Sequence, residues 1–280
     1  MTNESIISAK DLYYTYDGEP TPALNGLSLE IRQGEKVAVM GANGSGKSTF
    51  FLCLNGILRP QQGTLSFRGI PYSYKRKELL NLRSKIGIVF QDPDDQLFSA
   101  SVRQEISFGI LNLGADSRTA CKETEKIMDA LDITDFKDRP THALSGGQKK
   151  QVAIAGILVM HPDVVILDEP AAALDPKHTS LVNGIMDQMT KAGITVLIST
   201  HDPDHAFSWA DKVILFHHGK VLKSGSPTEV FADHPALKAA NLSKPAVLSM
   251  FESLRRKEII SAGTPVPKSL TELEQIIEGI

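Results

Sequence analysis

A glycine-rich stretch from Gly41 to Ser48 constrains the fold of this chain more than any other feature. Its sequence, GANGSGKS, fits the pattern G-x-x-x-x-G-K-[ST] at every fixed position. The apolar residues 37–40 before it predict a buried strand, and residues 48–54 after it predict a helix. In this strand–loop–helix context such a loop cradles phosphate, and its spacing differs from the G-x-G-x-x-G pattern of dinucleotide-binding folds.

The chemistry of phosphate binding explains the residue types in this loop. Glycines let backbone N–H groups approach phosphate oxygens with no Cβ in the way, and the following helix N-terminus adds partial positive charge. We expect Lys47 to reach the β- and γ-phosphates of a nucleotide and the Ser48 hydroxyl to ligate Mg²⁺. Kinases, GTPases and ATPases all carry such a loop, so other residues must narrow the function.

Composition sets outer limits on size and partners. A chain of 280 residues, of which 41% are hydrophobic, is large enough for one sizeable domain with an extension. The net charge of −3 argues against a general nucleic-acid coat, and the only dense basic runs are residues 75–77 and 255–257. The two cysteines, Cys53 and Cys121, lack metal-ligand spacing. Neither a signal peptide nor a membrane-length apolar run is evident, so we expect other chains to supply any membrane component.

The order of expected elements indicates an α/β fold. Strands are expected over residues 12–16, 27–31, 37–40, 64–67, 86–90, 164–167, 194–198, 213–216 and 220–222. The unbroken apolar runs are typical of central parallel strands, whereas residues 27–31 alternate like an antiparallel strand with one wet face. Together with the phosphate loop, this pattern resembles a P-loop NTPase core with a mainly parallel, RecA-like sheet and an antiparallel β subdomain. The last two strands are expected to form a hairpin across His218-Gly219.

Two helical parts complete the predicted architecture. Helices are expected over residues 48–54, 77–82, 105–113, 121–131, 146–160, 177–191, 248–257 and 269–277. From about residue 91 to 161 only helical patterns occur, so an α-helical subdomain is inserted into the core. After residue 233 prolines break the chain, and the last two helices are amphipathic. The predicted division is an ATP-binding domain, 1–233, and a short C-terminal helical extension, 234–280.

Two carboxylates follow the buried strand of residues 164–167. ATP hydrolysis needs one carboxylate near Mg²⁺ and a second group that orients the attacking water. Asp168 suits the first role, through a metal-bound water, and Glu169 suits the second. The alternative is an acidic strand end that caps the helix beginning near Lys177.

A second glycine-rich helix start lies within the predicted insert. Ser145 is a good N-cap, and the Gly146-Gly147 pair after it is expected to be exposed, which makes a second anion site. One nucleotide rarely needs two γ-phosphate sites from one chain, but a head-to-tail pair of subunits does. Each nucleotide would then lie between one chain's Lys47 loop and the other chain's Ser145 loop. An ordinary glycine-rich cap is the alternative.

Three single residues are candidates because of their positions. Gln91 ends a strand where the insert begins, so its side-chain oxygen is placed to touch Mg²⁺ or water, unless it is simply a loop glutamine. His201 follows another buried strand and is a candidate to hydrogen-bond the γ-phosphate, although a lone histidine is more often structural. Tyr16 becomes a candidate for stacking on adenine once a nucleotide is bound nearby; alone, it would be an edge-strand tyrosine.

Taken in order, these motifs resemble the ATPase subunits of ABC transporters. The phosphate loop and the segments LSGGQ (144–148), VILDEP (165–170) and THD (200–202) match that family in order and spacing over about residues 5–232. The resemblance implies three catalytic residues, namely the Q-loop glutamine Gln91, the base Glu169 and the switch histidine His201, with a D-loop at 173–175. The expected ATP-binding residues are Tyr16, Gly41, Asn43, Gly44, Ser45, Gly46, Lys47, Ser48, Thr49, Ser145, Gly146, Gly147 and Gln148; the expected Mg²⁺ ligands are Ser48, Gln91 and Asp168.

A narrower resemblance is carried by the segments FQDPDDQLF (90–98) and FGILNLG (108–114). They resemble the energy-coupling-factor class and, within it, cobalt-uptake ATPase subunits. That implies a peripheral ATPase on the cytoplasmic face of the cell membrane, expected as a homodimer. It would drive an integral membrane coupling protein, whose helices dock around the Q-loop and insert, while another membrane subunit holds the substrate. Three residues depart from the family pattern: Gln151 stands where Arg is usual, Ala171 where Thr or Ser is usual, and Ala173 where Gly or a similar small residue is usual. None of them removes a group expected to contact the nucleotide or Mg²⁺, so activity is expected.

Two alternatives stay open at this point. Nothing in the chain touches the transported substrate, so nickel or a vitamin can replace cobalt. A soluble non-transport ABC ATPase acting on nucleic acid or ribosomes is the rival from another class. Such proteins usually carry two fused cassettes, long coiled coils or zinc sites, which this sequence lacks, so no nucleic-acid partner is expected.

Overall fold

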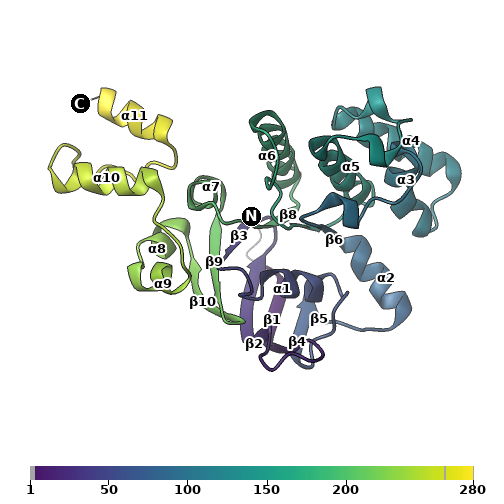
Figure 1. Ribbon diagram of the computed structural model, residues 1–280, viewed down its shortest axis with the longest axis horizontal. Helices are drawn as coiled ribbons and strands as arrows, with labels where there is room; N and C mark the ends of the chain where they lie inside the picture. Colours follow the sequence, from purple (N-terminus) through teal and green to yellow (C-terminus); the bar gives the residue numbers. More distant parts are fainter. Residues whose placement is uncertain (1–3, 262, 280) are drawn as a thin grey trace.

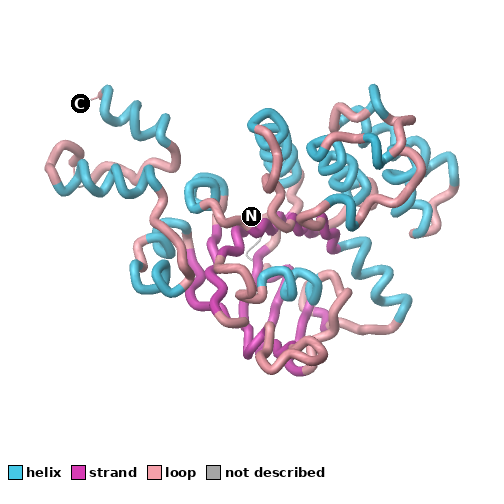
Figure 2. The backbone as a smooth tube through the Cα atoms, in the orientation of Figure 1, coloured by secondary structure: helices cyan, strands magenta, loops and turns pink. Residues whose placement is uncertain are grey.

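Two sheets form the centre of the computed structural model, which describes residues 4–261 and 263–279 (Figures 1 and 2). A six-stranded sheet has the order β10-β9-β3-β8-β7-β6, and a four-stranded sheet has the order β2-β1-β4-β5. The strands are β1 (Ser5–Tyr14), β2 (Leu24–Arg32), β3 (Lys36–Met40), β4 (Gln62–Phe67), β5 (Ile70–Pro71), β6 (Ile86–Val89), β7 (Val164–Leu167), β8 (Thr195–Ser199), β9 (Lys212–His217) and β10 (Lys220–Gly225).

The larger sheet is mainly parallel, as predicted. Strands β9, β3, β8, β7 and β6 run in one direction, and only the edge strand β10 is antiparallel to its neighbour. Every residue pair in the smaller sheet is antiparallel. Because the carboxyl ends of parallel strands meet at one edge, the segments that follow β3, β6, β7 and β8 are brought together there.

Alternation along the parallel strands divides the core between two faces. Val37 and Val39 of β3 pack in one hydrophobic cluster, with helix α1 (Lys47–Leu54) and the antiparallel sheet. Ala38 and Met40 pack in the other, which includes side chains of the helical insert and of the C-terminal helices. Successive residues of a strand point to opposite faces, so a strand buried on both sides reads as an unbroken apolar run.

The predicted helical insert is present, and no strand interrupts residues 91–161. Figure 1 shows its helices grouped at one end of the molecule, while the last two helices lie at the opposite end. Across the described residues, none of the helices has the length and apolar character to span a membrane. The further helices are α2 (Arg76–Lys85), α3 (Val102–Asn112), α4 (Ser117–Ala130), α5 (Gly146–Leu158), α6 (Pro176–Lys191), α7 (Pro203–Trp209), α8 (Pro227–Phe231), α9 (His234–Ala239), α10 (Ala246–Arg256) and α11 (Leu270–Glu278).

The structure differs from the sequence-based elements at several boundaries, and two of the differences matter most. The first strand ends at Tyr14, so Tyr16 lies beyond it, in a segment that turns at Asp17-Gly18. Helices α7, α8 and α9 were not predicted, because each spans seven residues or fewer and carries a proline in its first turn. Such short helices show too few turns for an apolar period to be visible. The proposed domain boundary at residue 233 falls between α8 and α9.

Candidate functional site

The glycine-rich loop after β3 is held between the two sheets. Gly41 has φ +146°, and a Cβ there would lie 2.3 Å from the carbonyl oxygen of Phe216. Gly46 precedes α1 with φ +104°, and a Cβ there would lie 2.4 Å from the carbonyl oxygen of Ala23. The tip of the β9–β10 hairpin also supports the loop, because the Gly219 N–H donates to the Ser45 carbonyl at 3.0 Å. Glycine is therefore required at both positions by close backbone approach.

Lys47 and Ser45 supply polar groups inside this loop. The Lys47 ammonium donates to the carbonyls of Gly41 at 2.7 Å and Ala42 at 3.2 Å. Burial lowers the pKa of Lys47, and the carboxylates of Glu169 and Asp168 oppose that shift. The Ser45 Oγ is buried without a hydrogen-bond partner among the described residues. A buried ammonium beside an unsatisfied hydroxyl fits a phosphate, which accepts hydrogen bonds from both.

Asp168 and Glu169 follow β7, and Ser199 at the end of β8 holds both of them. The Ser199 hydroxyl donates to Asp168 Oδ1 and accepts from the Glu169 N–H at 2.8 Å. Glu169 has φ +44°, a left-handed conformation that non-glycine residues rarely adopt. The bond from Ser199 therefore fixes the backbone where the Glu169 side chain leaves the sheet.

The three expected catalytic side chains meet at this edge. His201 Nε2 lies 2.9 Å from Glu169 Oε1, and the Gln91 amide donates to Glu169 Oε2 at 3.3 Å. Gln91 follows β6 closely and His201 follows β8 by two residues, so three neighbouring strand ends supply the three groups. The strand order alone accounts for this convergence.

A cleft of about 850 Å³ joins these side chains to the phosphate loop. Tyr16 lines it and is 40% exposed, with its hydroxyl 3.2 Å from Thr49 Oγ1 and its ring edge-on to Tyr14. This leaves much of the Tyr16 ring open to solvent, as stacking on a base requires. The predicted residues that line the cleft are Tyr16, Asn43, Gly44, Ser45, Gly46, Lys47, Ser48, Thr49, Gln91, Glu169 and His201.

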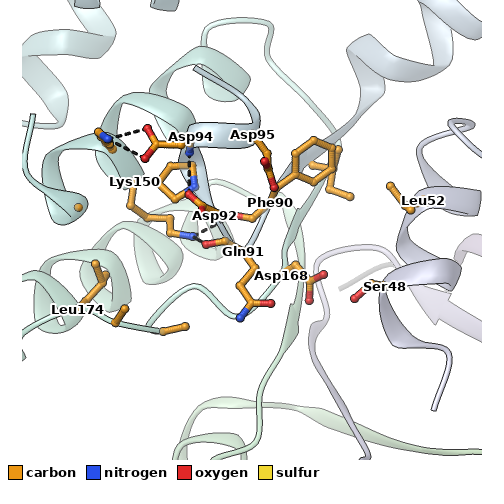
Figure 3. A pocket seen from close by; sticks show the side chains of 16 residues that line it. Ser48, Leu52, Phe90, Gln91, Asp92, Asp94, Asp95, Lys150, Asp168 and Leu174 are labelled. Atoms are coloured by element: carbon orange, nitrogen blue, oxygen red, sulfur yellow. Dashed lines mark hydrogen bonds and ion pairs between the residues drawn. The ribbon is translucent and has the colours of Figure 1, made fainter. Parts of the chain in front are cut away.

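A second pocket, of about 640 Å³, opens beside the first, and Ser48 and Gln91 line both (Figure 3). Figure 3 shows the Ser48 hydroxyl and the Asp168 carboxylate pointing toward one another, with Gln91 close by. Hydroxyl, carboxylate and amide oxygens are the donors that Mg²⁺ takes. Among the described residues, no group of three or more His, Cys, Asp or Glu side chains could hold a metal alone. A Mg²⁺ ion here would need phosphate oxygens and water to complete its coordination.

The Ser145 loop is capped as predicted but lies outside the cleft that residues 43–49 line. Gln148 N donates to Ser145 Oγ at 3.3 Å and Ser145 N donates to Gln148 Oε1 at 3.1 Å, a reciprocal capping box. Of the four predicted residues 145–148, only Gly146 lines either of the two pockets. Gly147 is buried rather than exposed. The His178 ring packs so closely against it that a Cβ there would lie 2.0 Å from the ring.

Sequence reasoning missed two polar residues of this site. Ser199 could have been noticed as a serine that ends a buried strand. Lys150 gave no comparable signal, because a lysine in a helix normally faces solvent. Its ammonium is buried and donates to the main-chain carbonyls of Phe90 and Gln91. Gln151, the residue that departs from the family pattern, is buried inside the insert and donates to the Leu131 carbonyl.

Replacing Ser199 with alanine is expected to lower both the free energy of unfolding and the rate of the ATP hydrolysis that the sequence predicts. The Glu169 N–H and the Asp168 carboxylate would each lose a partner, which costs about 1–3 kcal/mol of unfolding free energy. Urea unfolding and an ATPase assay measure the two effects. Thr195→Val is the matched control, since Thr195 is a buried residue at the other end of β8 whose hydroxyl accepts from Gly34 N. It should lose stability alone; equal turnover in the two variants would contradict a role for Ser199 at the site.

Comparisons with known proteins agree with this geometry. A family model described as "ABC transporter" matches residues 24–172. The energy-coupling factor transporter ATP-binding protein EcfA of Methanocaldococcus jannaschii is 45% identical over 256 residues, covering 91% of each chain. The protein of the same name from Methanococcus maripaludis is 41% identical, covering 98% of this chain and 99% of that one.

Solved structures show the same fold. CbiO1 from Clostridium perfringens, described as part of the ABC transporter complex cbiONQ, superposes with a TM-score of 0.75 and 43% identity over 90% of this chain and 99% of that chain. A dimeric ATP-binding cassette, MJ0796, bound to ADP and Pi, superposes with a TM-score of 0.72 and 26% identity over 79% of this chain and 98% of that chain. The chain belongs to the ABC transporter family, as an ATPase and an ATP-binding subunit of the energy-coupling-factor class.

Proposed function

We propose that this ATPase drives a membrane importer by hydrolysing ATP with Glu169 as the base. The observation that carries the proposal is the position of the Glu169 carboxylate, held between His201 and Gln91 in the cleft that the phosphate loop lines. Lys47 would bind the β- and γ-phosphates and Tyr16 would stack on adenine. His201 and Gln91 would orient the attacking water beside Glu169.

Ser48, Gln91 and, through a water, Asp168 would hold Mg²⁺. The ion would offset the negative charge that develops on the phosphate oxygens. Asp168 has one oxygen occupied by the Ser199 hydroxyl, so its other oxygen is the one free to receive a metal-bound water. Ser199 thus orients the carboxylate without removing it from the metal site.

Two copies of the chain would sandwich each ATP. The capped Ser145 loop, as the N-terminus of α5, would bind an anion, yet it lies outside the cleft that contains Lys47 of the same chain. A head-to-tail dimer resolves this arrangement, because the loop of one chain then faces the nucleotide of the other. The relative MJ0796 is described as dimeric in its ADP- and Pi-bound structure. We propose a homodimer that closes on ATP and reopens after hydrolysis.

An apolar groove on the insert would receive helices of a membrane coupling protein. The groove, of about 380 Å³, lies between α2, α3 and α5. Phe98 is 66% exposed there, and its ring packs edge-on to Phe108 with centroids 4.8 Å apart. Leu80 and Leu113 are also exposed and line the same groove. Contiguous exposed apolar side chains of this kind mark an interaction site.

A co-purification experiment tests this arrangement. From detergent extracts the wild-type chain should co-purify with integral membrane proteins, as we expect of a peripheral subunit at the cytoplasmic face of the membrane. Phe98→Asp should lower that recovery at least about tenfold, because a buried charge in the interface is costly, while ATP hydrolysis by the isolated chain persists. Ile70→Asp is the matched control, since Ile70 is 71% exposed on β5 and lies outside the groove. Recovery with ribosomes or DNA instead would overturn the transport role.

Cobalt ions are the substrate that we propose for the importer. Support comes from the segments 90–98 and 108–114, which resemble cobalt-uptake ATPase subunits. A separate membrane subunit would hold the ion. Uptake of labelled cobalt should fall in a strain that lacks the gene and return when it is restored. Uptake of nickel or a vitamin that follows the gene instead would replace cobalt.

A further inference from the structure

Lys150 is a buried cation that takes no part in the ATP binding, Mg²⁺ binding and hydrolysis proposed above. It lies on α5 with 1% of its surface exposed. Burial lowers its pKa to about 8, and the carboxylates of Asp168, Asp92 and Glu169 oppose that shift. Burying an ammonium is costly unless hydrogen bonds satisfy it. Here its Nζ donates to the carbonyls of Phe90 at 2.9 Å and Gln91 at 2.8 Å.

Gln91 is consequently held from two sides. Its backbone carbonyl accepts a hydrogen bond from Lys150 of the insert (Figure 3). Its side-chain amide donates to Glu169 in the core. Any movement of Gln91 toward or away from a γ-phosphate must either carry Lys150 with it or break a charge-assisted hydrogen bond. The residues after Gln91 are linked to α5 by an ion pair between Lys149 and Asp94. This link is weaker, because the Asp94 side chain is 61% exposed to solvent.

The same helix carries the Ser145 loop at its start. Lys150 follows Gly146 by four residues, so about 6 Å of helix separates them along the axis. The capping box between Ser145 and Gln148 joins the loop to that first turn. A helix this short transmits a displacement as a rigid body, so a shift at Lys150 is also a shift of the Ser145 loop.

We propose that Lys150 is a positioning residue that couples the nucleotide at one chain's phosphate loop to the same chain's Ser145 loop. In the dimer proposed above, on which this inference rests, that loop faces the nucleotide of the partner subunit. Occupation of one site then changes the other through Gln91, Lys150 and the first turn of α5. The predicted consequence is that the two sites of the dimer hydrolyse ATP cooperatively, and that Lys150 is needed for it.

ATP hydrolysis by the purified dimer, measured against ATP concentration, tests the role of Lys150. The wild type should show a Hill coefficient well above one, with two as the limit for two sites. Lys150→Met, which keeps the length but removes the charge, should bring it to about one and lower kcat about tenfold. Lys150→Arg should restore cooperativity. Lys149→Met is the control and should retain it, because an ion pair with an exposed partner contributes little.

Binding of a fluorescent ATP analogue to dilute, monomeric protein separates this role from a folding defect. Lys150→Met should bind the analogue within about threefold of wild type, since the phosphate loop is unchanged. Should that variant fail to fold, the hydrolysis measurements are repeated on Lys150→Gln, whose amide can donate to one carbonyl. They must still show a lowered Hill coefficient. A Lys150→Met enzyme that still hydrolyses ATP cooperatively would overturn this inference but not the proposed dimer. A wild type with a Hill coefficient of one would overturn it too, and absence of any ATP-dependent dimer would overturn the proposed dimer itself.

Discussion

Replacing Glu169 with glutamine is expected to lower ATP turnover at least about a hundredfold, or about 2.7 kcal/mol of activation free energy. The amide has the shape of the carboxylate but cannot accept a proton from water. Phosphate-loop contacts are untouched, so ATP should still bind. Because hydrolysis reopens the dimer in the proposed cycle, the variant should accumulate as an ATP-bound dimer.

Two measurements on the Glu169→Gln protein check this prediction. Phosphate release reports the turnover, and size-exclusion chromatography with and without ATP reports the dimer. Glu252→Gln provides a control for loss of a carboxylate, since Glu252 lies in α10 and pairs with Lys244. It should behave like wild type in both assays. Turnover within threefold of wild type for Glu169→Gln would remove Glu169 from the role of base.

Replacing Lys47 with methionine is expected to abolish ATP binding rather than hydrolysis alone. The Lys47 ammonium is the one cation among the described residues that line the nucleotide cleft. Removing it deletes charge-assisted hydrogen bonds to phosphate, and kcat/KM should fall at least about a hundredfold. Stability should change little, because the buried ammonium also carries a desolvation cost that lowers its pKa.

Calorimetric titration with ATP and thermal unfolding separate the two properties of the Lys47→Met protein. We expect no measurable binding heat at concentrations that saturate the wild type, with a melting temperature close to wild type. Ser45→Ala is the graded comparison, because it removes an uncharged donor from the same loop. Its affinity should fall about tenfold at most. If the Lys47→Met protein bound ATP within threefold of wild type, the phosphate loop would have to be reassigned.

Periodicity and strand order explain how much of the fold could be predicted from the sequence. Long apolar runs such as residues 164–167 mark strands buried on both faces, and their carboxyl ends had to meet once the strands were parallel. The convergence of Gln91, Glu169 and His201 follows from that topology. Helices α7 to α9 were missed because a single turn or two leaves no period, and their capping residues also occur in ordinary turns.

The parts of the site that were not predicted depend on contacts between distant segments. Ser199 acts on residues that lie 30 and 31 positions before it, and Lys150 acts on carbonyls 59 and 60 positions before it. Gly147 looked like an exposed cap glycine until the His178 ring of α6 was found against it. In each case the residue type was visible, but its partner was set by tertiary packing.

The position of the phosphate loop between the two sheets has a consequence for protein engineering. Gly41 is confined by the backbone at Phe216 of β9, and Gly46 by the backbone at Ala23, which directly precedes β2 of the other sheet. A graft of residues 41–48 into another α/β protein would therefore need both neighbours to reproduce the loop. Conversely, a chimera that exchanges only the β9–β10 hairpin between relatives should alter nucleotide affinity, although the hairpin contributes no residue to the nucleotide cleft.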